Sequence, residues 1–147
     1  MFKHEVPIVA PTPTPFYKDR VDYDRLGRNI EKWIKTDLSG FVLGSHGGEE
    51  FHLSDQEKFQ ILETVVQVND GRRVIIAGID EPSPNVAIEL ADNYKKSGAD
   101  FVRIRIPQSS SFGRSSEGVL DYFEHLLNNI SIPVILIHQP RQGANFD

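Results

Sequence analysis

The sequence predicts an α/β protein in which parallel strands alternate with helices. Five short apolar runs, most of them rich in β-branched or aromatic residues, are separated by four stretches with apolar residues at helical spacing. The runs begin at positions 7, 40, 73, 101 and 133, so the steps between them are 33, 33, 28 and 32 residues. Such a strand-helix repeat brings the loops after the strands to one edge of the sheet, where we expect the chemistry.

The first two helices have clear start signals. The predicted strands span residues 7–10, 40–43, 73–77, 101–106 and 133–137. The first helix opens at Asp22, and its apolar stripe consists of Leu26, Ile30, Trp33 and Ile34. The second helix opens with a capping box, in which Ser54 and Glu57 each satisfy an orphan backbone amide. The apolar residues that follow on its inner face are Phe59, Leu62, Val65 and Val66.

The third and fourth helices are also predicted from their end signals and apolar spacing. Ser83 is predicted to cap the third helix, and Pro84 fits the first helical position, where its missing N–H costs nothing. Gly98 is the natural left-handed stop of this helix. The fourth helix runs from about Ser116 to about Asn129, and its predicted apolar stripe consists of Leu120, Phe123 and Leu127.

Two architectures use this repeat. A doubly wound five-stranded sheet fits the length of 147 residues, but its fifth strand is normally followed by a helix, and only about ten residues follow here. An eight-stranded barrel fits the repeat better, although it needs roughly 250 residues. On that alternative, the chain holds a little over half of a barrel.

Composition excludes several classes of protein. The chain is 39% hydrophobic and 25% charged, as in an ordinary globular protein, and 16 basic against 21 acidic residues without a basic run argue against nucleic-acid binding. The absence of cysteine removes a disulfide framework, a zinc ribbon and a thiol nucleophile. The apolar runs are far shorter than the roughly 20 residues that cross a bilayer, and the N-terminus lacks a signal-peptide core, so we expect a cytoplasmic protein without a membrane partner.

The loop after the second strand, GSHGGEE at residues 44–50, is the most suggestive segment for binding. Its glycines let backbone amides approach an anion closely, and Ser45 and His46 add a hydroxyl and an imidazole. A flexible turn leading to the capped helix is the structural alternative. The loop after the first strand, PTPTPF, is stiffened by prolines, and its threonine hydroxyls are candidates to face a pocket.

Other clusters are weaker candidates. A metal site would use His46, Glu49, His52 and His138, but their spacing matches no compact metal motif. Ser45 lacks both a G-x-S-x-G elbow and an orienting acid, which argues against a nucleophile. Arg103 and Arg105 alternate with apolar residues and therefore share one face of the fourth strand, where a buried pair would need acidic partners. We interpret them as a structural salt network.

The order of these segments resembles the dihydrodipicolinate synthase and N-acetylneuraminate lyase family. The resemblance rests on PTPTPF, GFVLGSHGGEE followed by LSDQEK, VIIAG, SGADFVRIRIP and IPVILIHQP, which together span nearly the whole chain. It implies a (β/α)8 TIM barrel, of which residues 1–147 would be the N-terminal portion with five strands and four helices. It also implies Schiff-base aldol chemistry on pyruvate or a related 2-oxo acid with an aldehyde partner, no cofactor, and a homo-oligomer (dimer or tetramer) when the protein is full length.

The resemblance also suggests roles for particular residues. Gly44, Ser45, His46 and Gly47 look like the loop that binds the 2-oxo acid carboxylate, with Gly48 inserted before the acidic position. Thr14 and Arg141 are further candidates for substrate contact, the arginine toward a distal carboxylate. Ile137 stands where the family usually has a proton-relay tyrosine, and His138 is the nearest titratable substitute in sequence. The aromatic pair expected after the fourth strand is replaced by Gln108 and Ser109.

In the family that the sequence resembles, a lysine on the sixth strand forms the imine, so the resemblance implies that any such lysine of this protein would follow Asp147. We predict that none of the seven lysines of this chain can serve, because each lies in a helix or beside the first strand: Lys3, Lys18, Lys32, Lys35, Lys58, Lys95 and Lys96. The chain alone is therefore expected to be inactive as a lyase. The alternative is a non-catalytic truncated α/β module that binds a small anion or a partner. Unpaired outer strands also predict self-association or poor solubility.

Overall fold

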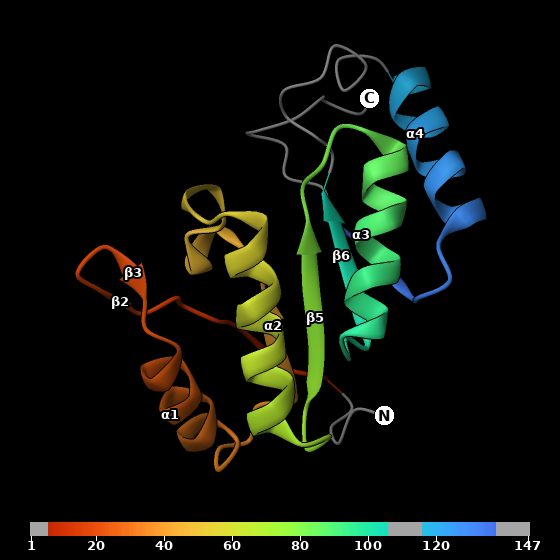
Figure 1. The fold of residues 1–147 in the computed structure, drawn as a ribbon. Helices are drawn as coiled ribbons and strands as arrows, with labels where there is room; N and C mark the ends of the chain where they lie inside the picture. Colours follow the sequence, from red (N-terminus) through yellow and green to blue (C-terminus); the bar gives the residue numbers. More distant parts are fainter. Residues whose placement is uncertain (1–5, 106–115, 138–147) are drawn as a thin grey trace.

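Parallel strands in sequential order form the centre of the molecule. The computed structural model describes residues 6–105 and 116–137 (Figure 1). Its five-stranded parallel sheet has the order β1 (Val9–Pro11), β4 (Gly40–Leu43), β5 (Val74–Ile79), β6 (Phe101–Arg105) and β7 (Val134–Ile137). Each strand thus pairs with the next along the chain. A doubly wound sheet reverses its strand order at a switch point, so the observed order is that of a partial barrel.

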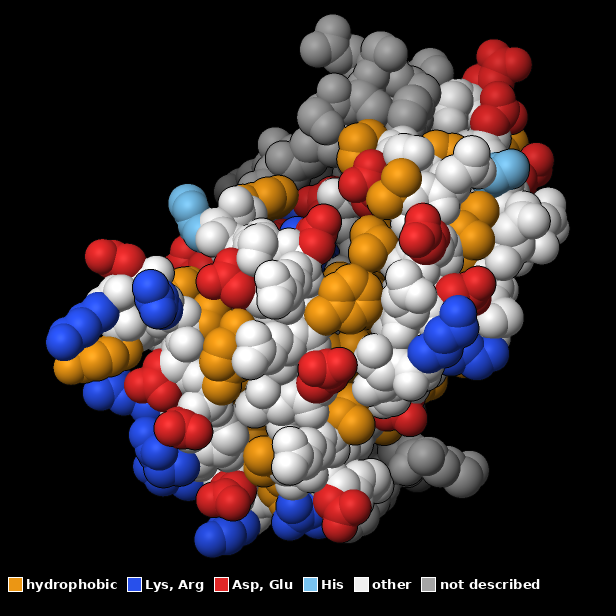
Figure 2. Space-filling view, viewed as in Figure 1, with side chains coloured by type: hydrophobic (Ala, Val, Ile, Leu, Met, Phe, Trp, Pro, Cys, Tyr) orange, Lys and Arg blue, Asp and Glu red, His pale blue; other side chains and the backbone are white. Residues whose placement is uncertain are grey.

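Four helices connect the strands within the described residues: α1 (Tyr23–Trp33), α2 (Asp55–Asn69), α3 (Pro84–Lys96) and α4 (Ser116–Asn129). In Figure 1, β5 is seen between α2 on its left and α3 on its right. Acidic and basic side chains are mixed over this helix-bearing face, as Figure 2 shows. None of the helices in residues 6–105 and 116–137 has both the length and the apolar character needed to cross a bilayer.

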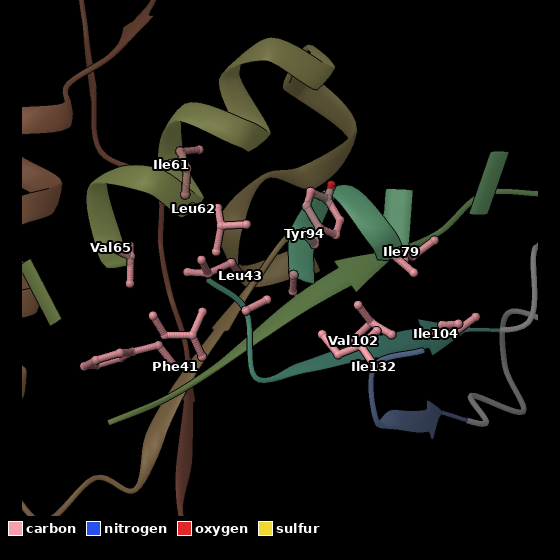
Figure 3. Close-up of a cluster of buried hydrophobic side chains, with 14 of the residues drawn as sticks. Phe41, Leu43, Ile61, Leu62, Val65, Ile79, Tyr94, Val102, Ile104 and Ile132 are labelled. Carbon is pink, nitrogen blue, oxygen red and sulfur yellow. The ribbon is translucent and has the colours of Figure 1, made fainter. Parts of the chain in front are cut away.

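Strand alternation separates a core face from an open face. Ile75, Ala77 and Ile79 of β5 belong to the hydrophobic core with the helices, whereas Ile76 between them lines a cavity on the other face. Figure 3 shows the core in close-up, with residues of α2 beside those of the strands. Burial of this apolar surface is the main force holding the helices on the sheet.

The predicted helix starts are largely confirmed. Asp22 caps α1 by accepting a hydrogen bond from the Arg25 amide at 2.9 Å, and Ser54 and Glu57 form the predicted capping box of α2. Ser83 differs, since it stands at the N-cap of α3 but its side chain makes no capping hydrogen bond. After α3, Gly98 has a φ of 99°, as a left-handed stop requires.

The apolar stripe predicted for α4 is wrong by one residue. The buried side chains of α4 are Val119, Tyr122 and Leu126, while Leu120 and Leu127 are 58% and 50% exposed. Both sets have helical spacing, so periodicity alone does not choose between them. The Tyr122 hydroxyl donates a 2.6 Å hydrogen bond to the Glu81 carbonyl oxygen, which fixes the rotation of the helix.

The loop after β1 contains a small hairpin that the sequence analysis missed. Its strands, β2 (Phe16–Tyr17) and β3 (Arg20–Val21), are antiparallel. Lys18 and Asp19 form the two-residue turn, with φ values of 49° and 60°. Positive φ at both central residues is typical of the tight turns that join two antiparallel strands.

Candidate functional site

A cavity of about 340 Å³ lies on the face of the sheet opposite the core. The β4 loop and alternate residues of β1, β4, β5, β6 and β7 surround it: Val9, Pro11, Val42, Ser45, His46, Gly47, Ile76, Arg103, Arg105, Ile135 and Ile137. Its wall is apolar except for the β4 loop and the two arginines of β6. The structure therefore brings the predicted residues Ser45, His46 and Gly47 together in one concave site with Ile137.

The β4 loop is held close to its neighbours through glycine. Gly44 has a φ of 60°, and a Cβ placed on Gly78 would lie only 2.0 Å from the Gly44 carbonyl oxygen. A Cβ on Gly48 would lie 2.8 Å from the Thr12 carbonyl oxygen. Real Cβ atoms do not approach so closely, so the loop depends on glycine at these positions.

The backbone conformation of the loop at Glu49 determines which glutamate is buried. Two short 3₁₀ turns, His46–Gly48 and Glu50–His52, are joined by Glu49 in the left-handed conformation, with a φ of 60°. As a result, the Glu49 side chain is exposed and the Glu50 side chain is only 6% exposed. The inward acidic residue is therefore Glu50, which the sequence analysis did not single out.

The hydroxyl groups near the loop differ in their partners. The Ser45 Oγ is buried and has no hydrogen-bond partner among the described residues, and Ser45 lines the cavity. The Thr14 Oγ1 donates to the Gly48 carbonyl oxygen at 2.7 Å and supports the loop. Thr14 is not among the residues that line the cavity. An unpaired buried hydroxyl costs about 1–3 kcal/mol, so the Ser45 hydroxyl is a group that a ligand in the cavity would satisfy.

Arg103 and Arg105 form the salt network that the sequence predicts, with Glu50 at its centre. Arg103 Nη2 donates to Glu50 Oε2 at 3.1 Å and to the Gly44 carbonyl oxygen at 2.6 Å. Arg105 Nη2 donates to Glu50 Oε1 at 2.7 Å and also contacts the Asp80 carboxylate. Two guanidiniums thus face two carboxylates, which balances the charge of this buried cluster.

Burial and pairing shift the pKa values of the two arginines in opposite directions. Burial is the largest cause for Arg103 and lowers its pKa, against the opposing effect of Glu50. Burial also acts to lower the pKa of Arg105, but the contacts with Asp80 and Glu50 outweigh it and raise the pKa. Guanidinium has an ordinary pKa above about 12, so both remain charged at neutral pH.

His46 is joined to the same network through both ring nitrogens. Its Nε2 lies 2.5 Å from Arg105 Nη1, and its Nδ1 lies 3.5 Å from Glu50 Oε1. The ring also contacts Phe51, with 5.2 Å between centroids, and the side chain is 39% exposed. The imidazole is therefore positioned by three neighbours while one side remains open to solvent.

The remaining candidates are placed as follows. Ile137 lines the cavity, and no lysine is among the described residues around it. His52 pairs with Glu49 at 3.9 Å on the surface, apart from the His46–Glu50 pair. Within residues 6–105 and 116–137, no cluster of three or more His, Asp or Glu side chains could hold a metal. His138, Arg141, Gln108 and Ser109 lie outside the described residues.

Comparison with known proteins assigns this fold to a family. The pattern of the dihydrodipicolinate synthetase family matches residues 6–147. The chain belongs to this family. The arrangement of five parallel strands and four helices is accordingly that of the N-terminal part of a family TIM barrel.

Relatives of the chain carry the name 4-hydroxy-tetrahydrodipicolinate synthase. The chain is 33% identical over 131 residues to the 4-hydroxy-tetrahydrodipicolinate synthase of Methanococcus maripaludis, covering 89% of this chain and 45% of the relative. It is 33% identical over 144 residues to that of Methanocaldococcus jannaschii, covering 98% and 48%. A crystal structure of dihydrodipicolinate synthase matches with a TM-score of 0.85 at 32% identity, over 92% of this chain and 46% of that chain. The chain thus spans about half the length of these relatives.

Sequence reasoning missed that the arginines of β6 face the same cavity as the β4 loop. The signal was present, because alternate strand residues of a barrel point inward and Arg103 and Arg105 share one face. Asp80, which follows β5, was missed altogether. Its position just after a strand, on the edge that carries the loops, is the signal that could have found it.

Proposed function

We propose that this chain supplies the 2-oxo acid-binding part of a Schiff-base lyase, an aldolase that acts on pyruvate or a related 2-oxo acid with an aldehyde partner. The observation that carries the proposal is the buried Ser45 hydroxyl, which has no partner among the described residues and belongs to a cavity that two guanidiniums also line. Rotation of this hydroxyl toward the cavity gives a carboxylate a donor. Loop amides and a nearby cation add charge-assisted hydrogen bonds, which are the stronger kind.

The imine-forming lysine is not part of the proposed site. The cavity is lined by no lysine of the described residues, and Lys58, which is near the strand ends, pairs with Asp55 at 3.1 Å on α2. We therefore propose that the 147-residue chain alone forms no imine with pyruvate. Treatment with pyruvate and borohydride should leave its mass unchanged. A trapped adduct on any of its seven lysines would overturn this part of the proposal.

Binding is tested by titrating the chain with pyruvate and following the affinity by calorimetry or NMR. Ser45→Ala removes one hydrogen bond to a charged ligand, worth about 1.5–3 kcal/mol, so Kd should rise about 10- to 100-fold. Ser97→Ala is the matched control, because Ser97 caps the end of α3 and does not line the cavity. Equal affinity of the Ser45→Ala variant and the unmodified chain would refute the carboxylate site.

A second function, a non-catalytic module that binds small anions, has one observation in its favour. Ile137 contributes an apolar side chain at the position where the family resemblance calls for a proton-relay tyrosine. The two functions differ in ligand preference. A lyase site should bind pyruvate more tightly than acetate or lactate, because it also recognises the keto group. Equal affinity for all three acids would favour the anion-binding module.

A further inference from the structure

We infer that His46, oriented by Glu50, removes and returns the C3 protons of a bound 2-oxo acid, so that the cavity supports enolisation without an imine. The inference rests on the proposed function, because it needs the acid's carboxylate to lie beside Ser45. It gives the cavity a proton acceptor, whereas Ile137, at the position where the family resemblance calls for a tyrosine, cannot accept one. It also assigns this role to His46 and not to His138.

The tautomer of His46 follows from its neighbours. A guanidinium carries only N–H donors, so the Nε2 that faces Arg105 at 2.5 Å must present its lone pair. The ring proton is then on Nδ1, which faces Glu50 Oε1 at 3.5 Å. A neutral imidazole with a carboxylate behind it and a lone pair in front is the arrangement of a general base.

His46 is the cavity residue suited to this task. The other described residues that line the cavity offer apolar side chains, one serine hydroxyl, a glycine and two guanidiniums, which do not take up a proton near neutral pH. The Glu50 carboxylate is buried and is held by both arginines, so it orients the ring. Because the His46 side chain is 39% exposed, the ring can also exchange its proton with water.

When the carboxylate of a ligand binds to Arg105, the lone pair of His46 Nε2 no longer accepts a hydrogen bond from that arginine. Arg105 Nη1 donates to a neutral imidazole nitrogen, whereas its Nη2 faces the carboxylates of Glu50 and Asp80. An ionised acceptor makes a hydrogen bond roughly twice as strong as a neutral one. The ligand carboxylate therefore replaces His46 at Nη1, while Glu50 and Asp80 keep Nη2. His46 Nε2 then faces the carbon next to the keto group.

The proton transfer balances without a further reactant. Nε2 takes a proton from C3, the C–H electron pair forms a C2=C3 double bond, and the carbonyl π electrons move to oxygen to give an enolate. The nearby guanidiniums stabilise the negative charge that develops. The imidazolium exchanges its proton with solvent and returns one to C3, which regenerates the keto acid. In D2O each cycle replaces one hydrogen of the pyruvate methyl group by deuterium.

The test uses the 147-residue chain with saturating pyruvate in D2O, and proton NMR measures the loss of the methyl signal. A general base contributes about 10²- to 10⁴-fold to a rate, so His46→Gln should slow protein-dependent exchange by at least about tenfold. Glutamine can still donate to Glu50 and accept from Arg105, but its amide does not take up a proton near neutral pH. His52→Gln is the matched control, because His52 is an exposed imidazole outside the cavity, and it should exchange like the unmodified chain.

The outcomes separate the inference from the proposed function. If pyruvate binds in a Ser45-dependent manner but His46→Gln exchanges as fast as the unmodified chain, His46 is not the base and the inference fails alone. If Ser45→Ala leaves pyruvate binding unchanged, the carboxylate site and the inference both fail. Circular dichroism of each variant shows whether the fold is retained, and a folded His46→Gln chain that binds pyruvate but has lost exchange confirms the inference.

Discussion

The two faces of the sheet are stabilised in different ways. On the core face, residues such as Ile75 and Leu62 pack against the helices, and many apolar contacts share the stabilisation. On the cavity face, a few charged pairs join β6 to the β4 loop, and Glu50 lies 55 residues from Arg105 in sequence. The core face should therefore tolerate volume-conserving substitutions, whereas the cavity face depends on individual partners.

The largest expected effect comes from removing the central charge of the cavity face. Glu50→Gln keeps the shape of the side chain but leaves Arg103 and Arg105 with Asp80 as their remaining carboxylate in the cluster. Removing one partner of a buried ion pair costs about 3–5 kcal/mol, because it leaves an uncompensated charge. We expect a loss of this size in the free energy of unfolding, measured by urea denaturation.

The adjacent glutamate is the control for this experiment. Glu49 carries the same charge one residue earlier, but its side chain is 56% exposed. Surface substitutions usually change stability by less than about 0.5 kcal/mol, so Glu49→Gln should unfold at nearly the same urea concentration as the unmodified chain. If both substitutions had equal effects, the cavity face would not depend on the buried pairs.

A somewhat smaller effect is expected from the core face, at α4. Leu126 is fully buried, and Leu126→Ala should lower the free energy of unfolding by about 2–5 kcal/mol through lost transfer energy and a cavity. Leu127 is 50% exposed and is the matched control, with an expected change below about 1 kcal/mol. If Leu127→Ala lowered the free energy of unfolding more than Leu126→Ala, the apolar stripe predicted from the sequence would be correct after all.

Features set by local chemistry were predictable from the sequence. Asp22 and Ser54 start helices because a side-chain oxygen meets an amide three residues later, and this needs no knowledge of the fold. The rotation of α4 was not predictable, because Val119 and Leu120 begin two stripes of equal spacing and tertiary contacts choose between them. The short hairpin after β1 was missed because its strands have two residues each, too few for a periodic pattern.

The candidate site was also predictable only in part, because several of its contacts depend on the fold. The β4 loop could be recognised as an anion site from its glycines, and the need of Arg103 and Arg105 for acidic partners followed from charge alone. The identity of those partners depended on the fold, because Asp80 lies 25 residues from Arg105 and the left-handed Glu49 turns Glu50 inward. The contacts of both His46 ring nitrogens likewise needed three-dimensional neighbours.

The smallest expected effect concerns the capping box of α2, a local device on the core face. The hydrogen bonds that Ser54 donates lower the pKa of Glu57, so this group stabilises the fold at pH values above its ordinary pKa and loses that contribution as pH falls through its lowered pKa. Ser54→Ala should reduce the free energy of unfolding by about 1 kcal/mol at pH 7. It should also reduce, without abolishing, the loss of stability at acidic pH, because the Ser54 backbone amide, the larger cause of the lowered Glu57 pKa, still donates to the carboxylate. Urea denaturation at pH 7 and at acidic pH measures both effects. Because this contribution requires only residues 54–57, it should persist in Glu50→Gln, and the two substitutions should be additive.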